Sequence, residues 1–126
     1  MEALKIEPSD DSPEVILDQQ GNRFEITGKS LPEDVVDFYQ PVLDWLGEYR
    51  NNTNSRTEFN FKLIYFNTAS SKLILDILMI FEEMVEEGQD ILVKWLSLGS
   101  DEDMQEAGRE YEEMIDVPFE HVTYER

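Results

Sequence analysis

The feature that most constrains the fold is a strand-like segment that leads almost directly into a helix-like segment, between residues 59 and 87. Residues 59–65 are rich in aromatic and branched side chains, which predicts a buried strand. Residues 72–87 have apolar side chains at helical spacing, which predicts a helix. The junction, residues 66–72, contains three hydroxyl side chains and no glycine or proline, so we expect almost no loop between the two elements.

The junction places polar side chains at the start of the predicted helix. Asn67, Thr68 or Ser70 can cap this helix, because a side-chain oxygen there accepts from backbone N–H groups that lack a partner within the helix. The same N–H groups and the positive end of the helix dipole favour a phosphate group. A hydroxyl at this position therefore suits two roles, helix cap and phosphorylation site, and the residues alone leave both open.

Length and charge limit the class of partner. A chain of 126 residues suits one domain, residues 1–126, with a single core. Its 10 basic and 29 acidic side chains give a net charge of −19, which repels the phosphates of nucleic acids and of anionic lipids. We therefore expect protein partners, no nucleic acid and no direct membrane insertion. The alternative is that the acidity serves solubility alone, for example in a saline habitat.

The N-terminus and the apolar runs bear on localisation. The chain has no cysteine, which suits a reducing compartment. No apolar stretch with a cleavage site follows Met1. The longest apolar run, residues 73–81, is interrupted by Asp76 and is too short to span a bilayer. The sequence predicts a cytoplasmic protein.

Hydrophobic patterns predict an α/β fold with the element order β-β-β-α-β-α-β-α-β. Strands are expected at residues 4–6, 15–17, 24–27, 59–65, 90–96 and 119–124. The first helix begins at a capping-box pattern from Ser30 to Glu33 and runs to Tyr49, with Pro41 kinking or splitting it. The third helix begins near Ser100. Strands joined through helices favour parallel pairing, so we expect a mixed sheet of five or six strands, with an antiparallel N-terminal hairpin and helices mainly on one face.

Two helices have predicted core faces. In the second helix this face comprises Leu73, Ile74, Ile77, Phe81, Met84 and Val85, and in the third Met104, Ala107, Tyr111, Met114 and Ile115. Leu75 and Met79 fall on the opposite side of the second helix, among acidic side chains and near Lys72 and Thr68. An apolar pair within an acidic rim is typical of a protein-docking surface, and methionine suits an adaptable contact. The alternative is that a neighbouring loop or helix covers Leu75 and Met79.

The residues that usually carry catalysis or metal binding do not form a pattern here. Adjacent acids such as Glu82 and Glu86 lie on a predicted helix surface, whereas acid–base catalysis needs two carboxyls in different environments. The acidic run that starts at Asp101 has Glu106 where a calcium loop needs glycine. His121 is the only histidine. We therefore predict no catalytic residue, no metal site and no cofactor, and a protein that is not an enzyme.

The residues around the junction resemble those of a known family. The segment from Leu63 to Lys72, with residues 75–78 after it, is similar to the SiaC family of bacterial regulatory phosphoproteins. Further agreement lies in residues 42–45, 93–95 and 116–119, and the likeness covers about residues 13–122. The Asn-Thr-x-Ser-Ser pattern of residues 67–71 is its most specific part.

The resemblance implies a fold akin to the STAS domain of anti-sigma-factor antagonists and a switch residue at the junction. It implies phosphorylation of Thr68 by a Ser/Thr kinase of the family's operon, reversed by a membrane-linked phosphatase, with Ser70 and Ser71 as secondary candidates. In the unphosphorylated form, family members bind and activate a diguanylate cyclase, which promotes cyclic-di-GMP synthesis and aggregation or biofilm growth. The partner-binding residues expected here are Asn67, Thr68, Lys72, Leu75 and Met79.

Two other functions remain open at this stage. In the first, the chain is also a partner-switching protein, but its partner is an anti-sigma or histidine-kinase-like protein with a kinase fold. The other is an enzyme or small-molecule binder, which requires a sizeable polar pocket with convergent titratable groups.

Overall fold

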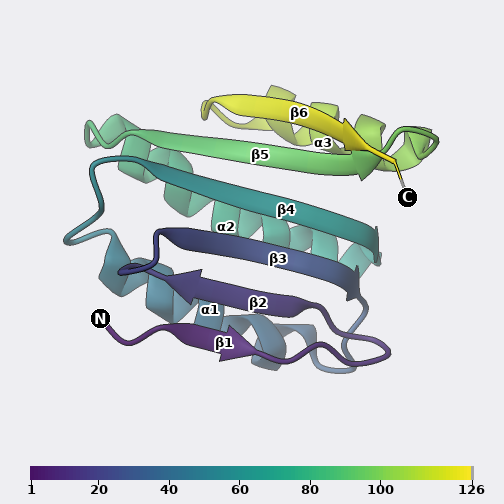
Figure 1. Cartoon of the computed structure of the whole chain (residues 1–126), viewed down its shortest axis with the longest axis horizontal. Helices are drawn as coiled ribbons and strands as arrows, with labels where there is room; N and C mark the ends of the chain where they lie inside the picture. The colour runs from purple at the N-terminus through teal and green to yellow at the C-terminus, as the bar shows by residue number, and fades with distance from the viewer. Residues whose placement is uncertain (126) are drawn as a thin grey trace.

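One sheet holds all six strands, in the same order as along the chain (Figure 1). The computed structural model describes residues 1–125. The strands are β1 (Leu4–Ile6), β2 (Glu14–Asp18), β3 (Arg23–Ser30), β4 (Thr57–Phe66), β5 (Ile91–Leu98) and β6 (Phe119–Tyr124). β1, β2 and β3 are antiparallel neighbours, whereas β3 to β6 run parallel. The expected mixed sheet with an antiparallel N-terminal part is confirmed.

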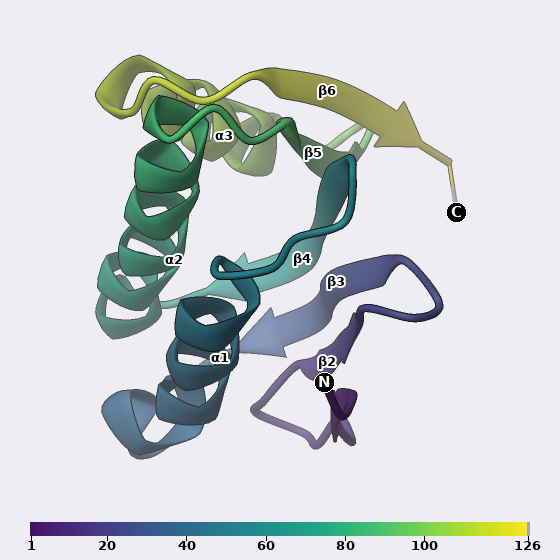
Figure 2. The ribbon, with the colours of Figure 1, turned by 90° about the vertical axis from the view of Figure 1, so that its left-hand side faces the viewer.

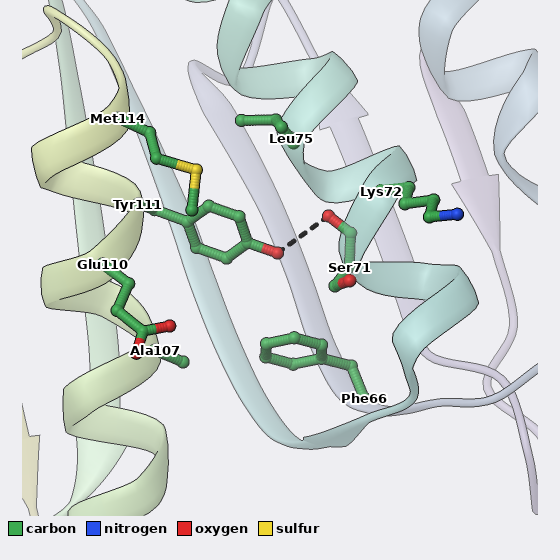
Figure 3. Close-up of a pocket in the computed structure, with 8 residues that line it drawn as sticks. All are labelled: Phe66, Ser71, Lys72, Leu75, Ala107, Glu110, Tyr111 and Met114. Atoms are coloured by element: carbon green, nitrogen blue, oxygen red, sulfur yellow. Dashed lines mark hydrogen bonds between the residues drawn. The ribbon is translucent and has the colours of Figure 1, made fainter.

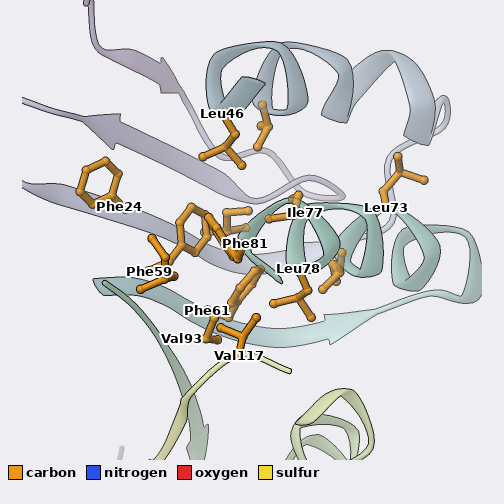
Figure 4. Close-up of a cluster of buried hydrophobic side chains, with 14 of the residues drawn as sticks. Phe24, Leu46, Phe59, Phe61, Leu73, Ile77, Leu78, Phe81, Val93 and Val117 are labelled. Carbon is orange, nitrogen blue, oxygen red and sulfur yellow. The ribbon is translucent and has the colours of Figure 1, made fainter. Parts of the chain in front are cut away.

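Three helices cover one face of the sheet: α1 (Val35–Tyr49), α2 (Thr68–Glu86) and α3 (Glu102–Met114). Figure 2 shows all three on the same side, with the other face of the sheet uncovered. Strand residues therefore alternate between a core face and an outer face. In β4, Phe59 and Phe61 are fully buried, whereas Lys62 is exposed. The ring of Phe81 on α2 lies 5.0 Å from that of Phe59, at the centre of the core (Figure 4).

The expected start of the first helix is wrong. Ser30 is the last residue of β3, where it pairs with Phe66, and its buried hydroxyl bonds to those of Tyr39 and Ser70. The helix begins at Val35 and is capped by Asp34, four residues after Ser30; the Asp34 side chain accepts from Asp37 N at 3.0 Å. Ser30 therefore forms hydrogen bonds to distant residues of the fold and does not cap the helix, although the local sequence pattern predicts a cap there. Pro41 lies within α1 and does not split it.

The third helix, α3, packs closely on the sheet because a glycine faces a tryptophan at their contact. Gly108 faces Trp95 of β5, and a Cβ on Gly108 would lie 2.5 Å from Trp95 Cδ1. Trp95 Nε1 also donates to the carbonyl of Met104, at 2.9 Å. The predicted core face of this helix is only partly right. Met104, Tyr111 and Ile115 are buried, Ala107 is partly buried, and Met114 is 59% exposed at the end of the helix.

Charge is distributed unevenly between helices and strands. The helices contain thirteen acidic and two basic side chains, a net charge of −11. The strands contain five of each, a net charge of zero: Glu14, Asp18, Glu25, Glu58 and Glu120 against Lys5, Arg23, Lys29, Lys62 and Lys94. The remainder of the −19 lies in the connections and the chain ends. The helix layer is therefore strongly acidic and the sheet is nearly neutral.

Candidate functional site

The junction between β4 and α2 uses Asn67 as the helix cap. Its side-chain oxygen accepts from Ser70 N at 2.8 Å, and its own N–H donates to the carbonyl of Ser30 at 3.1 Å. Its extended backbone (φ −86°, ψ 173°) turns the chain from strand to helix without a loop. Since Asn67 fills the capping role, the hydroxyl of Thr68 is not needed for it.

Thr68 is the first residue of α2 and is exposed to solvent. Within residues 1–125, the backbone N–H groups of Thr68 and Ala69 have no acceptor, as expected for the first turn of a helix. These groups and the helix dipole give the site an affinity for anions. Lys72 lies four residues further along, so its side chain is on the same face as Thr68.

The two neighbouring hydroxyls are engaged in hydrogen bonds. Ser70 is fully buried, and its Oγ donates to the carbonyl of Ser30 at 2.8 Å. Ser71 is partly exposed, and its Oγ donates to the carbonyl of Thr68 at 2.6 Å. Of the three hydroxyls in the junction, that of Thr68 alone is both exposed and without a hydrogen bond to another residue in the described part of the chain.

A β-bulge precedes the junction. Leu63 pairs with Gly28, and Tyr65 pairs with the next residue of β3, Lys29, so Ile64 has no partner on that strand. Gly28 has φ +114°, a backbone conformation that residues other than glycine rarely adopt. The extra residue turns two large apolar side chains outward: Ile64 is 47% exposed and Tyr65 is 53% exposed.

A groove of about 220 Å³ separates α2 from α3 (Figure 3). From the β4–α2 side it is lined by Phe66, Ser71, Lys72 and Leu75, and from α3 by Ala107, Glu110, Tyr111 and Met114. The Tyr111 hydroxyl crosses the groove and donates to the Ser71 carbonyl at 2.8 Å. Burial raises the pKa of Tyr111, so this phenol is a neutral donor at physiological pH.

A second hollow adjoins the groove, with a volume of about 350 Å³. It shares Phe66 and Ala107 with the first and extends it to the β-bulge. Its remaining lining residues are Ile64, Tyr65, Asp101, Asp103 and Met104. We refer to the two hollows together as the α2–α3 trough.

The structure brings some of the expected partner-binding residues together and separates others. Lys72 and Leu75 line the trough, although Lys72 extends away from α3 in Figure 3. Thr68 and Asn67 lie just before its α2 side and do not line it. Met79 is 46% exposed, one turn beyond Leu75 and outside the lining. Leu75 is partly buried and packs against the core, so the alternative of a covered side chain holds in part for Leu75 and not for Met79.

Sequence reasoning missed the contribution of α3 and of the bulge. The sequence predicts a core face that includes Ala107, Tyr111 and Met114, and it predicts no role for Glu110. It also places Ile64 and Tyr65 in a buried strand, which is wrong, because both side chains are exposed. A methionine in the last turn of an acidic helix was the available signal for Met114. The exposure of Ile64 depends on the register between β3 and β4, which has no local signature.

In residues 1–125, no group of three His, Cys, Asp or Glu side chains is placed to hold a metal ion. None of the helices described is long and apolar enough to cross a membrane. The hollows described above are open surface features.

A mixed six-stranded sheet covered on one face by three helices defines a STAS-like domain. A family model for SiaC family regulatory phosphoproteins matches residues 6–124. The chain belongs to the SiaC family.

Solved structures of this family share the fold. Apo-SiaC from Pseudomonas aeruginosa is 27% identical, with a TM-score of 0.89 over 98% of this chain and 100% of that chain. In a crystal structure of the diguanylate cyclase SiaD in complex with its activator SiaC, also from Pseudomonas aeruginosa, the matching chain is 27% identical, with a TM-score of 0.91 over 96% of this chain and 99% of that one. An uncharacterized protein of Pseudomonas aeruginosa strain UCBPP-PA14 is 29% identical over 119 residues, 94% of each chain.

Proposed function

We propose that this chain is a non-enzymatic regulatory phosphoprotein of the cytoplasm. Reversible phosphorylation of Thr68 controls its binding to, and activation of, a diguanylate cyclase. The observation that carries the proposal is the state of the Thr68 hydroxyl, which is exposed at the start of α2 while Asn67 supplies the cap and Ser70 is buried. The relative that crystallised with SiaD as its activator supports the choice of partner.

The surface around Thr68 suits such a switch. Lys72, Leu75 and Met79 follow Thr68 along one side of α2, and Asn67 precedes it, so a partner that contacts α2 covers the Thr68 hydroxyl. A phosphate on Thr68 brings almost two negative charges into that contact. The free N–H groups of the first turn and the Lys72 ammonium would hold this phosphate, so Lys72 would no longer be available to the partner.

Only a modest difference in binding free energy between the two phosphorylation states is required for this switch. Losing one charge-assisted contact and adding a hydrated dianion to an interface costs a few kcal/mol. Since each 1.4 kcal/mol is about a factor of ten in affinity, the two phosphorylation states would differ by orders of magnitude in binding. A cognate Ser/Thr kinase and a phosphatase then set the fraction of protein able to bind the cyclase.

The test compares wild-type protein with Thr68→Ala and Thr68→Asp as baits for partner capture from native cells, together with phosphosite mass spectrometry. We expect Thr68→Ala to capture a diguanylate cyclase, Thr68→Asp to lose it, and phosphate to be found on Thr68. Ser55→Asp adds the same charge at an exposed loop position and should capture the cyclase normally. Equal capture by the Thr68 variants would reject the switch.

The second candidate partner is a kinase-fold regulator, in the manner of anti-sigma-factor antagonists. The STAS-like fold favours it, because that fold is shared with those antagonists. Recovery of a kinase-fold protein and no cyclase by Thr68→Ala would select this alternative and leave Thr68 as the switch.

A further inference from the structure

We propose that the uncovered face of the sheet packs against the same face of a second copy of this chain, giving a symmetric dimer with both helix layers on its outside. This inference goes beyond the proposed function and does not depend on it, because it concerns the face of the sheet that the helices leave open.

The uncovered face carries an apolar strip over the last two strands. Side chains of β5 alternate between the buried core and this face, and Leu96 and Leu98 point to the open side. Their neighbours on β6 are also apolar, since Leu96 pairs with Val122 and Leu98 pairs with Tyr124. All four side chains are partly exposed, and Leu92 lies further along β5 on the same face. Contiguous apolar side chains on an open face are typical of a protein-docking surface.

The direction of the strands also indicates that this face is covered. Strands β3 to β6 run parallel, and parallel sheets in proteins are normally covered on both faces. Figure 2 shows the helices of this chain on one face only. Apart from Lys94 and Ser97, β5 is apolar on both faces, as in a strand that is buried from both sides. A further layer of protein is therefore expected over the open face.

Charge indicates which protein supplies that layer. The strands have a net charge of zero and the helices one of −11. On the open face, Arg23 pairs with Glu25 at 3.0 Å and Lys94 with Glu58 at 3.1 Å, so acidic side chains there are neutralised in place. A basic partner is attracted to the helix layer, whereas a partner as acidic as this chain can approach only the neutral sheet. A second copy has that acidity, and it brings an identical neutral face.

Packing the two sheets face to face also keeps the helix layers apart. Packed sheets lie about 10 Å from each other, and a helix layer adds about 10 Å beyond each sheet. The two acidic layers would then be roughly 30 Å apart, about three Debye lengths at 0.1 M salt. Repulsion between the copies is therefore largely screened in this arrangement, which is not so when helix layers meet.

The size of the face predicts a weak dimer. Six strands about 4.8 Å apart, with eight residues in β3 and in β5 at about 3.3 Å each, give a face of roughly 600 Å² per copy. Stable interfaces bury roughly 600–1,000 Å² per partner, so this face lies at the lower limit. We therefore expect a dissociation constant in the micromolar range, about 1–100 μM.

Sedimentation velocity of the full chain over a concentration series tests the dimer. Wild-type protein should change from monomer to dimer between about 1 μM and about 1 mM. Association should tighten when salt is raised to about 0.5 M, because the contact is apolar and salt screens the repulsion between two chains of net charge −19. Weaker association in salt would show an interface held by ion pairs and would count against the apolar strip.

Substitutions on the strip locate the contact. Leu96→Asp and Val122→Asp each bring two like charges together across the symmetry axis, so each should weaken self-association at least tenfold. Val36→Asp introduces the same side chain on α1, at a position that is 57% exposed, and should associate like wild type. Circular dichroism and urea unfolding establish that the variants are folded.

A second pair of variants tests the charge of the face without altering an apolar residue. The Lys62 ammonium lies 4.5 Å from the centre of the Tyr124 ring and is exposed on the open face. Lys62→Glu should weaken self-association about fivefold or more, because it makes the face acidic. Arg109→Glu makes the same change of net charge on α3, where Arg109 contacts only Glu106 in an exposed ion pair, and should associate like wild type.

Photo-crosslinking in native cells identifies the occupant of the face. A benzophenone side chain in place of Val122 should yield a crosslinked pair of this chain, and the same group in place of Val36 should not. The inference would be overturned by a chain that stays monomeric up to about 1 mM, by equal losses in sheet and helix variants, or by crosslinks from position 122 to a different protein alone. These outcomes leave partner capture through Thr68 unaffected, so the proposed function is tested separately.

Discussion

The hydroxyl of Ser70 donates to the main-chain carbonyl of Ser30, 2.8 Å away, and so ties the first turn of α2 to the end of β3. Ser70 Oγ also accepts from Ser30 Oγ at 2.9 Å, and the latter bonds to the Tyr39 hydroxyl. All three side chains are fully buried. This network fixes the position of the exposed residue Thr68 two places earlier in the chain.

Removing Ser70 Oγ should therefore destabilise the protein. We expect Ser70→Ala to lower the free energy of unfolding by roughly 1–3 kcal/mol, because the Ser30 carbonyl loses one of its two donors and Ser30 Oγ loses its acceptor in a buried site. Urea denaturation measures this loss. Ser71→Ala removes a hydroxyl that bonds only to the carbonyl of Thr68 at a partly exposed site, and should change stability by less than about 0.5 kcal/mol. Comparable losses in the two variants would contradict the role of the network.

Replacing Gly108 or Gly47 by alanine should change the free energy of unfolding in opposite directions. A Cβ on Gly108 would meet the Trp95 ring at 2.5 Å, so Gly108→Ala should destabilise the protein by roughly 1–3 kcal/mol. Gly47 lies within α1 with no atom within 4 Å of an added Cβ. Gly47→Ala should stabilise by about 0.5–1 kcal/mol, since alanine has the higher helix propensity. Thermal and urea unfolding of the two variants check both signs.

Stability should fall in alkaline solution because of Tyr39. Burial raises the pKa of this phenol to about 12, against about 10 in an unfolded chain. The neutral phenol therefore contributes its full stabilisation below pH ~10, and this contribution is lost as the pH rises to about 12, a loss of roughly 2–3 kcal/mol. Burial also raises the pKa of Tyr111, which adds to the decline in the same direction. In urea titrations over this range Tyr39→Phe should show a shallower slope than wild type; parallel slopes would argue against Tyr39 as the cause.

An anion at position 68 should stabilise the chain before any partner is added. Thr68→Asp places a carboxylate beside the free N–H groups of the first turn, so we expect it to be more stable than Thr68→Asn by about 0.3–1 kcal/mol at low ionic strength. The pair Ser55→Asp and Ser55→Asn measures the cost of one more negative charge on a chain of net charge −19. The advantage at position 68 over position 55 should shrink in 1 M salt. No difference between the two positions would show that the helix start does not favour an anion.

Most of the fold was predictable because its signals are local. The nine elements occur in the expected order, and residues 59–65 lie in a strand that leads directly into a helix, as expected. The capping box from Ser30 to Glu33 failed because Ser30 bonds to Tyr39 and Ser70, and neither contact is visible in a local pattern. Pro41 was expected to kink or split its helix, and α1 is continuous through it.

The candidate site was only half predictable. The sequence places Thr68, Lys72 and Leu75 on one side of α2, because the spacing within a single helix can be read from the chain. The opposite wall comes from α3, about 40 residues further on, where Tyr111 bonds across to Ser71. The spacing of α3 predicts Met114 as a core residue, whereas the structure exposes it. Which face of one helix meets another depends on the packing of both against the sheet. The periodicity of α3 alone could not show that its last turn extends past the core.

The separation of charge between the helix layer and the sheet makes the molecule an electric dipole roughly perpendicular to the sheet. Such a dipole turns in the field of a cationic protein while the two are still a Debye length apart, about 10 Å at 0.1 M salt. The helices would face the partner before first contact, which shortens the rotational search for the correct encounter. Association should therefore slow with added salt more than dissociation quickens.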